Sequence, residues 1–184
     1  PGCGMWWEDD GSKIEWLGNK GFEGCSMAEP NAASNIREYY GGHERFSTAL
    51  ESMMEGVDKV DSGQLTADEI TDPKGWVLLG FIMDPRTGLG RYRDYRISNY
   101  QLMMDMVDYC GSMSAEQILA IQDVKERTDR YFAQQTDFTT MLKRCTTIHD
   151  KLIVADLRGG QEIFYGTRFT RYAIYPDCNA GLKI

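Results

Sequence analysis

A long amphipathic segment in the second half of the chain constrains the fold more than any other feature. From residue 123 to about residue 149, apolar side chains recur at helical spacing, with charged residues on the opposite side. The positions on the inner side are Val124, Tyr131, Phe132, Gln135, Phe138, Met141, Leu142, Cys145 and Ile148. We therefore expect one long helix, with a domain boundary within it or at its end.

Directly after this segment the spacing of apolar residues changes from the helical period to alternation, which is typical of strands. Gly159-Gly160 is expected to form a turn there. The segments predicted to be strands are 152–157, 162–165 and 172–175, and residues 179–184 resemble a further strand that has just begun. The chain should therefore be mainly helical up to about residue 120 and enter a sheet near residue 151.

Shorter helices are expected before the long one. Pro30 stands where the first turn of a helix accepts proline, and Gly41-Gly42 should end that helix. Further helices are predicted over residues 47–60, 99–110 and 115–121, whereas the short apolar run 76–83 is compatible with a strand or a helix. Residue 1 is proline and no signal segment follows it, so we expect an internal piece of a longer protein.

Composition narrows the class of protein. The 184 residues include 42% hydrophobic ones, enough for a real core. The net charge of -8 disfavours broad binding to nucleic acid or an anionic membrane, although a local basic patch remains compatible with it. The sequence contains no run of roughly 18 apolar residues, so no membrane-spanning helix is predicted. The five cysteines contain no C-x-x-C pair, which favours free thiols in a reducing, cytoplasmic setting.

Two acidic segments are candidates for holding a metal. Glu8, Asp9 and Asp10 are adjacent carboxylates, which either bind a hard cation such as Mg²⁺ or Mn²⁺ or form a solvated acidic turn. Residues 58–69 imitate a calcium loop, but Val60 stands where an oxygen ligand is needed, and Pro73 follows too closely for the exit helix. Asp61 remains a suitable single metal-binding carboxylate.

A loop over residues 84–96 carries four arginines in an acidic chain, together with Gly88 and Gly90. Arginine forks match phosphate oxygens, and the alternation of tyrosine and arginine would also allow stacking on nucleobases. The alternative is a loop whose arginines pair with Asp84, Asp94 and nearby glutamates. The candidate substrate-binding residues are Arg86, Arg91, Arg93 and Arg96.

The two histidines, His43 and His149, lie on different predicted elements, and neither has a serine or cysteine nucleophile pattern nearby. A Ser-His-Asp or Cys-His hydrolase is therefore poorly supported. His149, near a helix C-terminus, is better explained by a favourable dipole contact.

Several blocks of the sequence, in order, resemble the exopolyphosphatase-related branch of the DHH phosphoesterases. They are PGCGMWW at residues 1–7, the segment 32–42, VDKVDSGQLT at 57–66 and GWVLLGFIMDPRTG at 75–88. The resemblance implies an α/β fold, with part of a DHH-type domain rich in helices over residues 1–121. A connector helix over 122–149 and the start of a smaller α+β substrate-binding domain over 150–184 would follow. The active site would lie in the cleft between the domains.

The resemblance also implies two divalent metals, Mn²⁺ or Mg²⁺, and assigns roles to particular residues. The family's Asp-His-His motif is replaced here by Glu8-Asp9-Asp10. Asp9 takes the place of a metal-binding histidine, Asp10 the place of the catalytic histidine that faces the phosphate, and Asp61 matches a metal-binding aspartate. A carboxylate can replace imidazole as a ligand of a hard metal, but it repels a phosphate.

The expected function is metal-dependent hydrolysis of polyphosphate or of a similar phosphoanhydride or phosphodiester. One alternative is a phosphodiesterase for short oligonucleotides or cyclic dinucleotides, and another is a non-catalytic protein that binds a phosphate ligand. The expected partners are a phosphate-containing small molecule, polyphosphate or a short nucleic acid, and no membrane. The oligomeric state is left open, with a homodimer compatible with the family.

Overall fold

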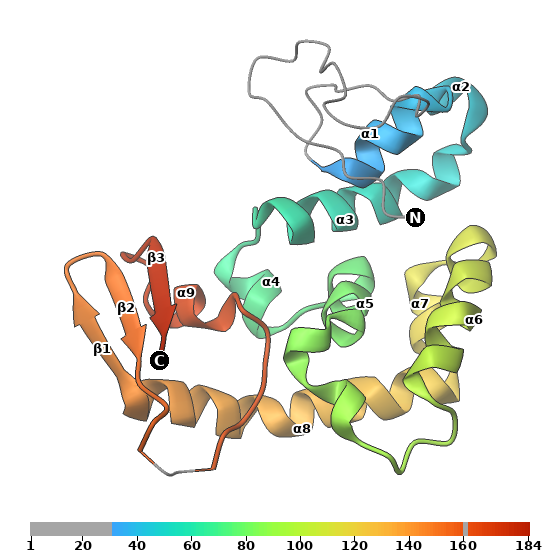
Figure 1. The fold of residues 1–184 in the computed structure, drawn as a ribbon. Coiled ribbons are helices and arrows are strands. Elements are labelled where there is room, and N and C mark those ends of the chain that lie inside the picture. The colour runs from blue at the N-terminus through green and yellow to red at the C-terminus, as the bar shows by residue number, and fades with distance from the viewer. Residues whose placement is uncertain (1–30, 160–161) are drawn as a thin grey trace, which may run out of the picture. The chain divides into compact units, whose positions relative to one another are not determined.

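The structure, a computed structural model, describes residues 31–159 and 162–184 (Figure 1). The chain divides into two compact units, Pro1–Gln64 and Leu65–Ile184. The domain boundaries expected from the sequence, at residues 121 and 149, stay a prediction. Among the described residues, no helix combines the length and apolar character needed to cross a membrane. Cys110, Cys145 and Cys178 are free thiols.

In the described part of the first unit, polar side chains hold the first helix to the third. The helices are α1 (Ala32–Tyr39), α2 (Gly42–Arg45) and α3 (Glu51–Ser62), with a 3-10 turn, η1 (Thr48–Leu50), before α3. The Asn31 side chain caps α1 by accepting hydrogen bonds from the amides of Ala33 and Ser34. The Asp58 carboxylate on α3 accepts from the Asn31 amide group and, at 2.8 Å, from the Ser34 hydroxyl. Asp58 therefore ties the start of α1 to α3.

The second unit is built along one long helix, α8 (Gln122–Cys145), which confirms the strongest expectation from the sequence. Helices α6 (Asn99–Ser112) and α7 (Ala115–Leu119) precede it and lie near its N-terminal end, whereas the sheet lies at its C-terminal end (Figure 1). The unit also contains α4 (Ala67–Thr71), α5 (Gly75–Met83), α9 (Thr170–Ile174) and the 3-10 turns η2 (Pro85–Thr87) and η3 (Leu89–Arg91).

The apolar run whose conformation the sequence left open forms α5, the central helix of this core. Its residues Val77, Leu78, Leu79, Phe81 and Ile82 are all buried, so the helix is apolar around most of its circumference. α5 packs against α7 and α8. The Phe81 ring stacks on Phe169 with ring centroids 6.0 Å apart, which joins the core to the segment before α9.

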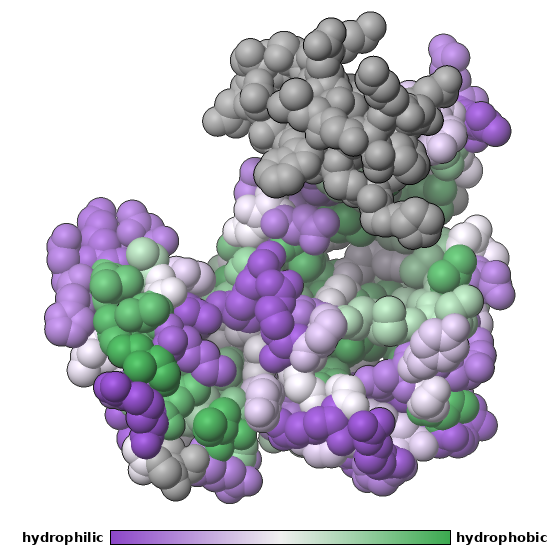
Figure 2. Space-filling model, viewed as in Figure 1, coloured by the Kyte–Doolittle hydropathy of each residue, from purple (hydrophilic) through white to green (hydrophobic). Residues whose placement is uncertain are grey.

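The sheet is small and mixed. β1 (Thr146–His149) and β2 (Leu152–Ala155) form an antiparallel hairpin, and β3 (Ala180–Lys183) lies parallel to β2. Ile153 and Ala155 are buried on one side of β2. In the space-filling view, hydrophobic residues also gather over the sheet (Figure 2), where Ile148 and Leu182 are 44% and 49% exposed. The strand expected after residue 179 is confirmed.

Two predicted strands are wrong, and the long helix ends earlier than expected. Residues 162–165 have no regular structure, and residues 172–174 belong to α9. Such short segments carry too few residues for alternation to decide, and burial of Phe169 against Phe81 favours a helical turn beside it. α8 ends at Cys145 because the β-branched run 146–148 enters the sheet. The fold class expected from the sequence, a helix-rich α/β structure with a long helix followed by a small sheet, is confirmed.

A buried arginine on α8 holds the segment before α6 in place. The Arg127 side chain is 1% exposed, and burial lowers its pKa. Its guanidinium donates to the carbonyl oxygens of Ile97 at 2.6 Å and Asp123 at 2.9 Å, and to Asn99 Oδ1 at 3.1 Å. It also stacks over the Tyr95 ring, 3.8 Å from the centroid. One side chain thus satisfies acceptors on both α8 and the loop.

We expect Arg127→Ala to lower the free energy of unfolding by about 3 kcal/mol or more, because each polar acceptor left buried without a donor costs roughly 1–3 kcal/mol. Urea unfolding followed by circular dichroism measures the change. Lys125→Ala is the matched control, since Lys125 lies on the same helix and forms only an exposed pair with Asp129. That control should change stability by less than about 0.5 kcal/mol. Equal losses in the two variants would contradict the role given to Arg127.

Candidate functional site

The acidic candidates fall in different parts of the chain. Asp9 and Asp10 lie outside the described residues. Asp61 is the penultimate residue of α3, and it is exposed. Asp61 belongs to the first unit and the four candidate arginines belong to the second, so a shared cleft stays a prediction. In the described ranges, no group of three or more histidine, cysteine or acidic residues is arranged to hold a metal ion.

The segment that imitates a calcium loop uses its carboxylates for other purposes. Asp58 accepts hydrogen bonds from Asn31 and Ser34. Glu69 completes a capping box at the start of α4, where its carboxylate accepts from the Thr66 amide at 2.9 Å. Both terminal positions of the would-be loop are therefore engaged in the fold.

The arginine loop folds back on itself and on α8. Asp84 caps η2 and also accepts from the Arg86 Nε at 2.8 Å. Arg96 forms a bidentate pair with Asp123 of α8, at 2.8 and 2.6 Å. This hydrogen-bonded pair raises the pKa of Arg96 and lowers that of Asp123. The pairing with acidic neighbours that the sequence offered as the alternative is thus present at these two arginines.

The alternating tyrosines of the loop stack on arginines of the same chain. Arg91 lies over Tyr92 and Tyr165, 4.8 and 4.4 Å from the ring centroids. Arg130 of α8 also lies over rings of the loop, 4.1 Å from the Tyr92 centroid and 5.0 Å from that of Tyr95. These contacts belong to the packing of the loop against α8. Arg93 is exposed.

One ion pair holds these stacked tyrosines and arginines against α8. Asp94 accepts two hydrogen bonds from Arg130, each 2.6 Å long. These hydrogen bonds lower the pKa of Asp94 to about 2. The loop is therefore fixed along α8 by Arg96, Arg127 and Arg130, and its first arginine, Arg86, lies at the opposite end, toward the sheet.

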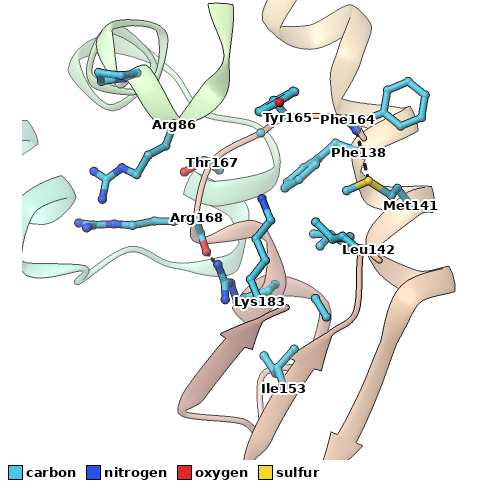
Figure 3. A pocket seen from close by; sticks show the side chains of 15 residues that line it. Arg86, Phe138, Met141, Leu142, Ile153, Phe164, Tyr165, Thr167, Arg168 and Lys183 are labelled. Atoms are coloured by element: carbon cyan, nitrogen blue, oxygen red, sulfur yellow. Dashed lines mark hydrogen bonds between the residues drawn. The ribbon is translucent and has the colours of Figure 1, made fainter. Parts of the chain in front are cut away.

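A pocket of about 370 Å³ lies where the end of α8 meets the sheet, η2 and the segment 164–168 (Figure 3). One wall is apolar and comes from α8, β2 and the segment after it. Its residues are Phe138, Met141, Leu142, Ile153, Ala155, Leu157 and Phe164. The rest of the lining includes one polar residue, Thr167, and four cationic ones, Arg86, Arg168, Arg171 and Lys183.

The cationic residues reach the pocket from three separate segments. Arg86 belongs to η2, Arg168 and Arg171 to the stretch around α9, and Lys183 to β3. In Figure 3 the side chains of Arg86 and Arg168 extend in the same direction, and Lys183 points into the middle of the pocket. None of the lining residues is acidic. Because like charges repel when gathered at one place, this lining favours an anionic ligand.

Two glycines make room for the aromatic residues of the pocket. A Cβ at Gly166 would lie only 2.1 Å from the Phe138 ring. Gly88 has a φ of +72°, and a Cβ there would lie 2.7 Å from Tyr165. The Phe164 amide donates to the Met141 sulfur at 3.2 Å, which holds this segment against α8. The shape of the pocket therefore depends on the absence of side chains at these positions.

Sequence reasoning identified one pocket residue, Arg86, and missed Arg168, Arg171 and Lys183. The missed cations are scattered over sixteen residues of the chain, and only Lys183 lies in a segment that was predicted to be a strand. The Gly166-Thr167-Arg168 sequence carried a weak signal, because glycine followed by a hydroxyl and an arginine suits close contact with an anion. Only the fold shows that these residues share a pocket with Arg86.

Comparison with known proteins identifies a similar solved structure. No family model matches the chain, and no curated protein matches it. A solved phosphodiesterase has the same fold, with a TM-score of 0.75 and 45% sequence identity over 84% of this chain. It is the pGpG-specific phosphodiesterase PggH from Vibrio cholerae. The chain spans about half of that protein, 51% of its length.

This similarity supports the phosphoesterase class predicted from the sequence. Because the similar protein is a phosphodiesterase, the similarity favours the alternative of a phosphodiesterase for short oligonucleotides or cyclic dinucleotides over a polyphosphate hydrolase. The exopolyphosphatase-related branch, the metals and the roles of Asp9, Asp10 and Asp61 stay predictions. The roles of the four loop arginines also stay predictions.

We expect Gly166→Ala to lower the free energy of unfolding by about 1–3 kcal/mol, because the added methyl group must displace the Phe138 ring. The control is Gly159→Ala, since a Cβ at Gly159 meets nothing within 4 Å. Thermal unfolding of both variants measures the difference. A Gly166→Ala protein as stable as the control would show that Phe138 moves aside without cost.

Proposed function

We propose that this protein hydrolyses the phosphodiester bond of a short linear dinucleotide. The observation that carries the proposal is the 45% identity, over 84% of the chain, to a pGpG-specific phosphodiesterase. The sequence resemblance to metal-dependent phosphoesterases points to the same reaction class. The proposal thus takes the second of the functions expected from the sequence in place of polyphosphate hydrolysis.

The chemistry of the pocket supports a nucleotide over polyphosphate. A polyphosphate chain has no apolar part, so it would leave the wall of Phe138, Met141, Leu142 and Ile153 facing a strongly charged ligand. A nucleotide offers both a charged phosphate and a flat, largely apolar base. Small-molecule sites commonly combine an apolar wall with a few polar anchors in this way.

The cations of the pocket would bind and orient the substrate. Each charge-assisted hydrogen bond from Arg168, Lys183 or Arg86 to a phosphate oxygen contributes roughly 1.5–3 kcal/mol. The apolar wall excludes water from one side of the bound phosphate, which strengthens these interactions. Arg91 and Arg96 are engaged by Tyr165 and Asp123, so their part in substrate binding is proposed to be indirect, through the position of the loop.

We further propose that hydrolysis requires two divalent cations, Mn²⁺ or Mg²⁺, which in such sites activate a water molecule and neutralise charge on the phosphate. Of the proposed ligands, only Asp61 lies among the described residues. A single exposed carboxylate does not make a metal site. The proposed site therefore depends on Asp9 as well.

With Mn²⁺ present, the protein should convert pGpG to mononucleotides, as measured by chromatography of the products. The kcat/KM for pGpG should exceed that for polyphosphate by at least about tenfold, or ~1.4 kcal/mol. Asp61→Asn should abolish turnover without changing the unfolding midpoint, because the residue is exposed. Glu55→Gln, another exposed carboxylate of α3, is the matched control.

Other outcomes of this assay would overturn the proposal. A preference for polyphosphate would make the protein a phosphoanhydride hydrolase. Binding of pGpG without turnover, in the presence of either metal, would make it a non-catalytic protein that binds a phosphate ligand.

The altered motif gives a separate prediction. Asp10 places negative charge where a phosphate would come to rest, and two unit charges about 4 Å apart repel by about 4 kcal/mol at an effective dielectric of about 20. Asp9→His together with Asp10→His should therefore raise Mn²⁺-dependent turnover by at least about tenfold. Adding Asp61→Asn to the double variant should remove the gain. A double variant no faster than the parent would show that Glu8-Asp9-Asp10 works as it is or that turnover is limited elsewhere.

A further inference from the structure

The cationic pocket contains a buried hydroxyl that the protein itself does not satisfy. Thr167 is 1% exposed and lines the pocket. Its Oγ1 has no hydrogen-bond partner in the described part of the chain. A buried hydroxyl without a partner is costly. A ligand oxygen in the pocket would satisfy this group, so Thr167 points to a ligand independently of the charges.

The charge of the lining favours a phosphate monoester over a phosphodiester as the ligand. Arg168, Arg171, Lys183 and Arg86 are cationic, and no acidic residue lines the pocket. Asp84, which is not a lining residue, accepts a hydrogen bond from Arg86 at 2.8 Å. A terminal phosphate monoester carries a charge of about -1.5 to -2 at neutral pH, whereas an internal diester carries only one negative charge. The excess of cations therefore matches a monoester better than a diester.

The composition of the lining indicates that a phosphate bound in this pocket is not the phosphodiester that is hydrolysed. The pocket is lined by no aspartate, glutamate, histidine or cysteine, so its own side chains offer no ligand set for a divalent cation. A phosphate held here would be recognised, and the scissile phosphodiester would lie at a different place.

We infer that this pocket is a recognition site for the terminal 5′-phosphorylated nucleotide of the substrate. Arg168, Lys183 and Thr167 bind the phosphate monoester, and Arg86 completes the cationic rim. The adjoining nucleoside lies against the apolar wall that includes Phe138, Leu142 and Ile153. The volume of about 370 Å³ is within the range of small-molecule sites. This inference rests on the proposed function for the identity of the ligand as a nucleotide.

Isothermal titration calorimetry of the chain with three probes tests the site without requiring turnover. The probes are guanosine 5′-monophosphate, its 5′-methyl phosphodiester and guanosine. The monophosphate should bind at least about tenfold more tightly than either of the other two, or ~1.4 kcal/mol. Its affinity should fall as the pH drops below about 6, where the monoester gains a proton, whereas the affinity of the diester should not.

Variants locate the binding on the pocket. Lys183→Ala and Arg168→Ala should each weaken binding of the monophosphate by at least about tenfold and change binding of guanosine by less than about twofold. Lys183 is exposed on β3, so its variant is expected to fold even if Arg168→Ala does not. Lys143→Ala, an exposed lysine of α8 outside the pocket, is the control and should have no effect.

Equal binding of the monophosphate and guanosine would overturn the inference, as would unchanged affinity in the Lys183 variant. The proposed function is tested separately, by comparing pGpG with the same dinucleotide that lacks the 5′-phosphate. Cleavage of both with equal kcat/KM would refute the recognition site and leave the phosphodiesterase activity intact. Selective binding of the monophosphate without any turnover would support the site and refute the proposed activity.

Discussion

The buried guanidinium of Arg127 is the interaction on which most of the second unit depends. It lies inside the protein on α8, and burial alone would disfavour it. The cost is offset because the carbonyl of Ile97 and the side chain of Asn99 accept its hydrogen bonds and Tyr95 covers its plane. These contacts of Arg127 therefore fix the position of the loop before α6 relative to α8. Without the hydrogen bonds of Arg127, the stacking of Tyr92 on Arg91 and Arg130 and the ion pair of Asp94 with Arg130 would not be held in place.

Fixing the loop has a consequence for the pocket at the other end of α8. The same loop begins at Asp84 and Arg86, and Arg86 reaches the pocket. The remaining cations belong to the stretch around α9 and to β3, which follow α8 in the chain. A ligand that spans these segments would contact residues almost one hundred positions apart, from Arg86 to Lys183. The site therefore exists only when the helix, the loop and the sheet have all formed.

The fold was predictable where burial repeats over many residues. The period of residues 123–149 predicted the long helix, because a helix of 24 residues buries one consistent side over many turns. The secondary structure of short segments was harder to predict. Residues 172–174 alternate like a strand, but they form part of α9, because contacts of neighbouring Phe169 with Phe81 outweigh local preference. The run that became α5 could not be assigned, since a helix buried all round shows no period.

By itself, the sequence determined the helix-rich α/β class, the long helix and the presence of arginines in excess at one loop. These features follow from local periodicity, from backbone preference and from composition. Only the tertiary structure decided which arginines are engaged in the fold and which reach a pocket. Arg96 pairs with Asp123, whereas Arg86 lines the pocket and extends alongside Arg168, although both arginines belong to the same loop. The physical reason is that charge and residue type are local properties, whereas convergence depends on how distant segments pack.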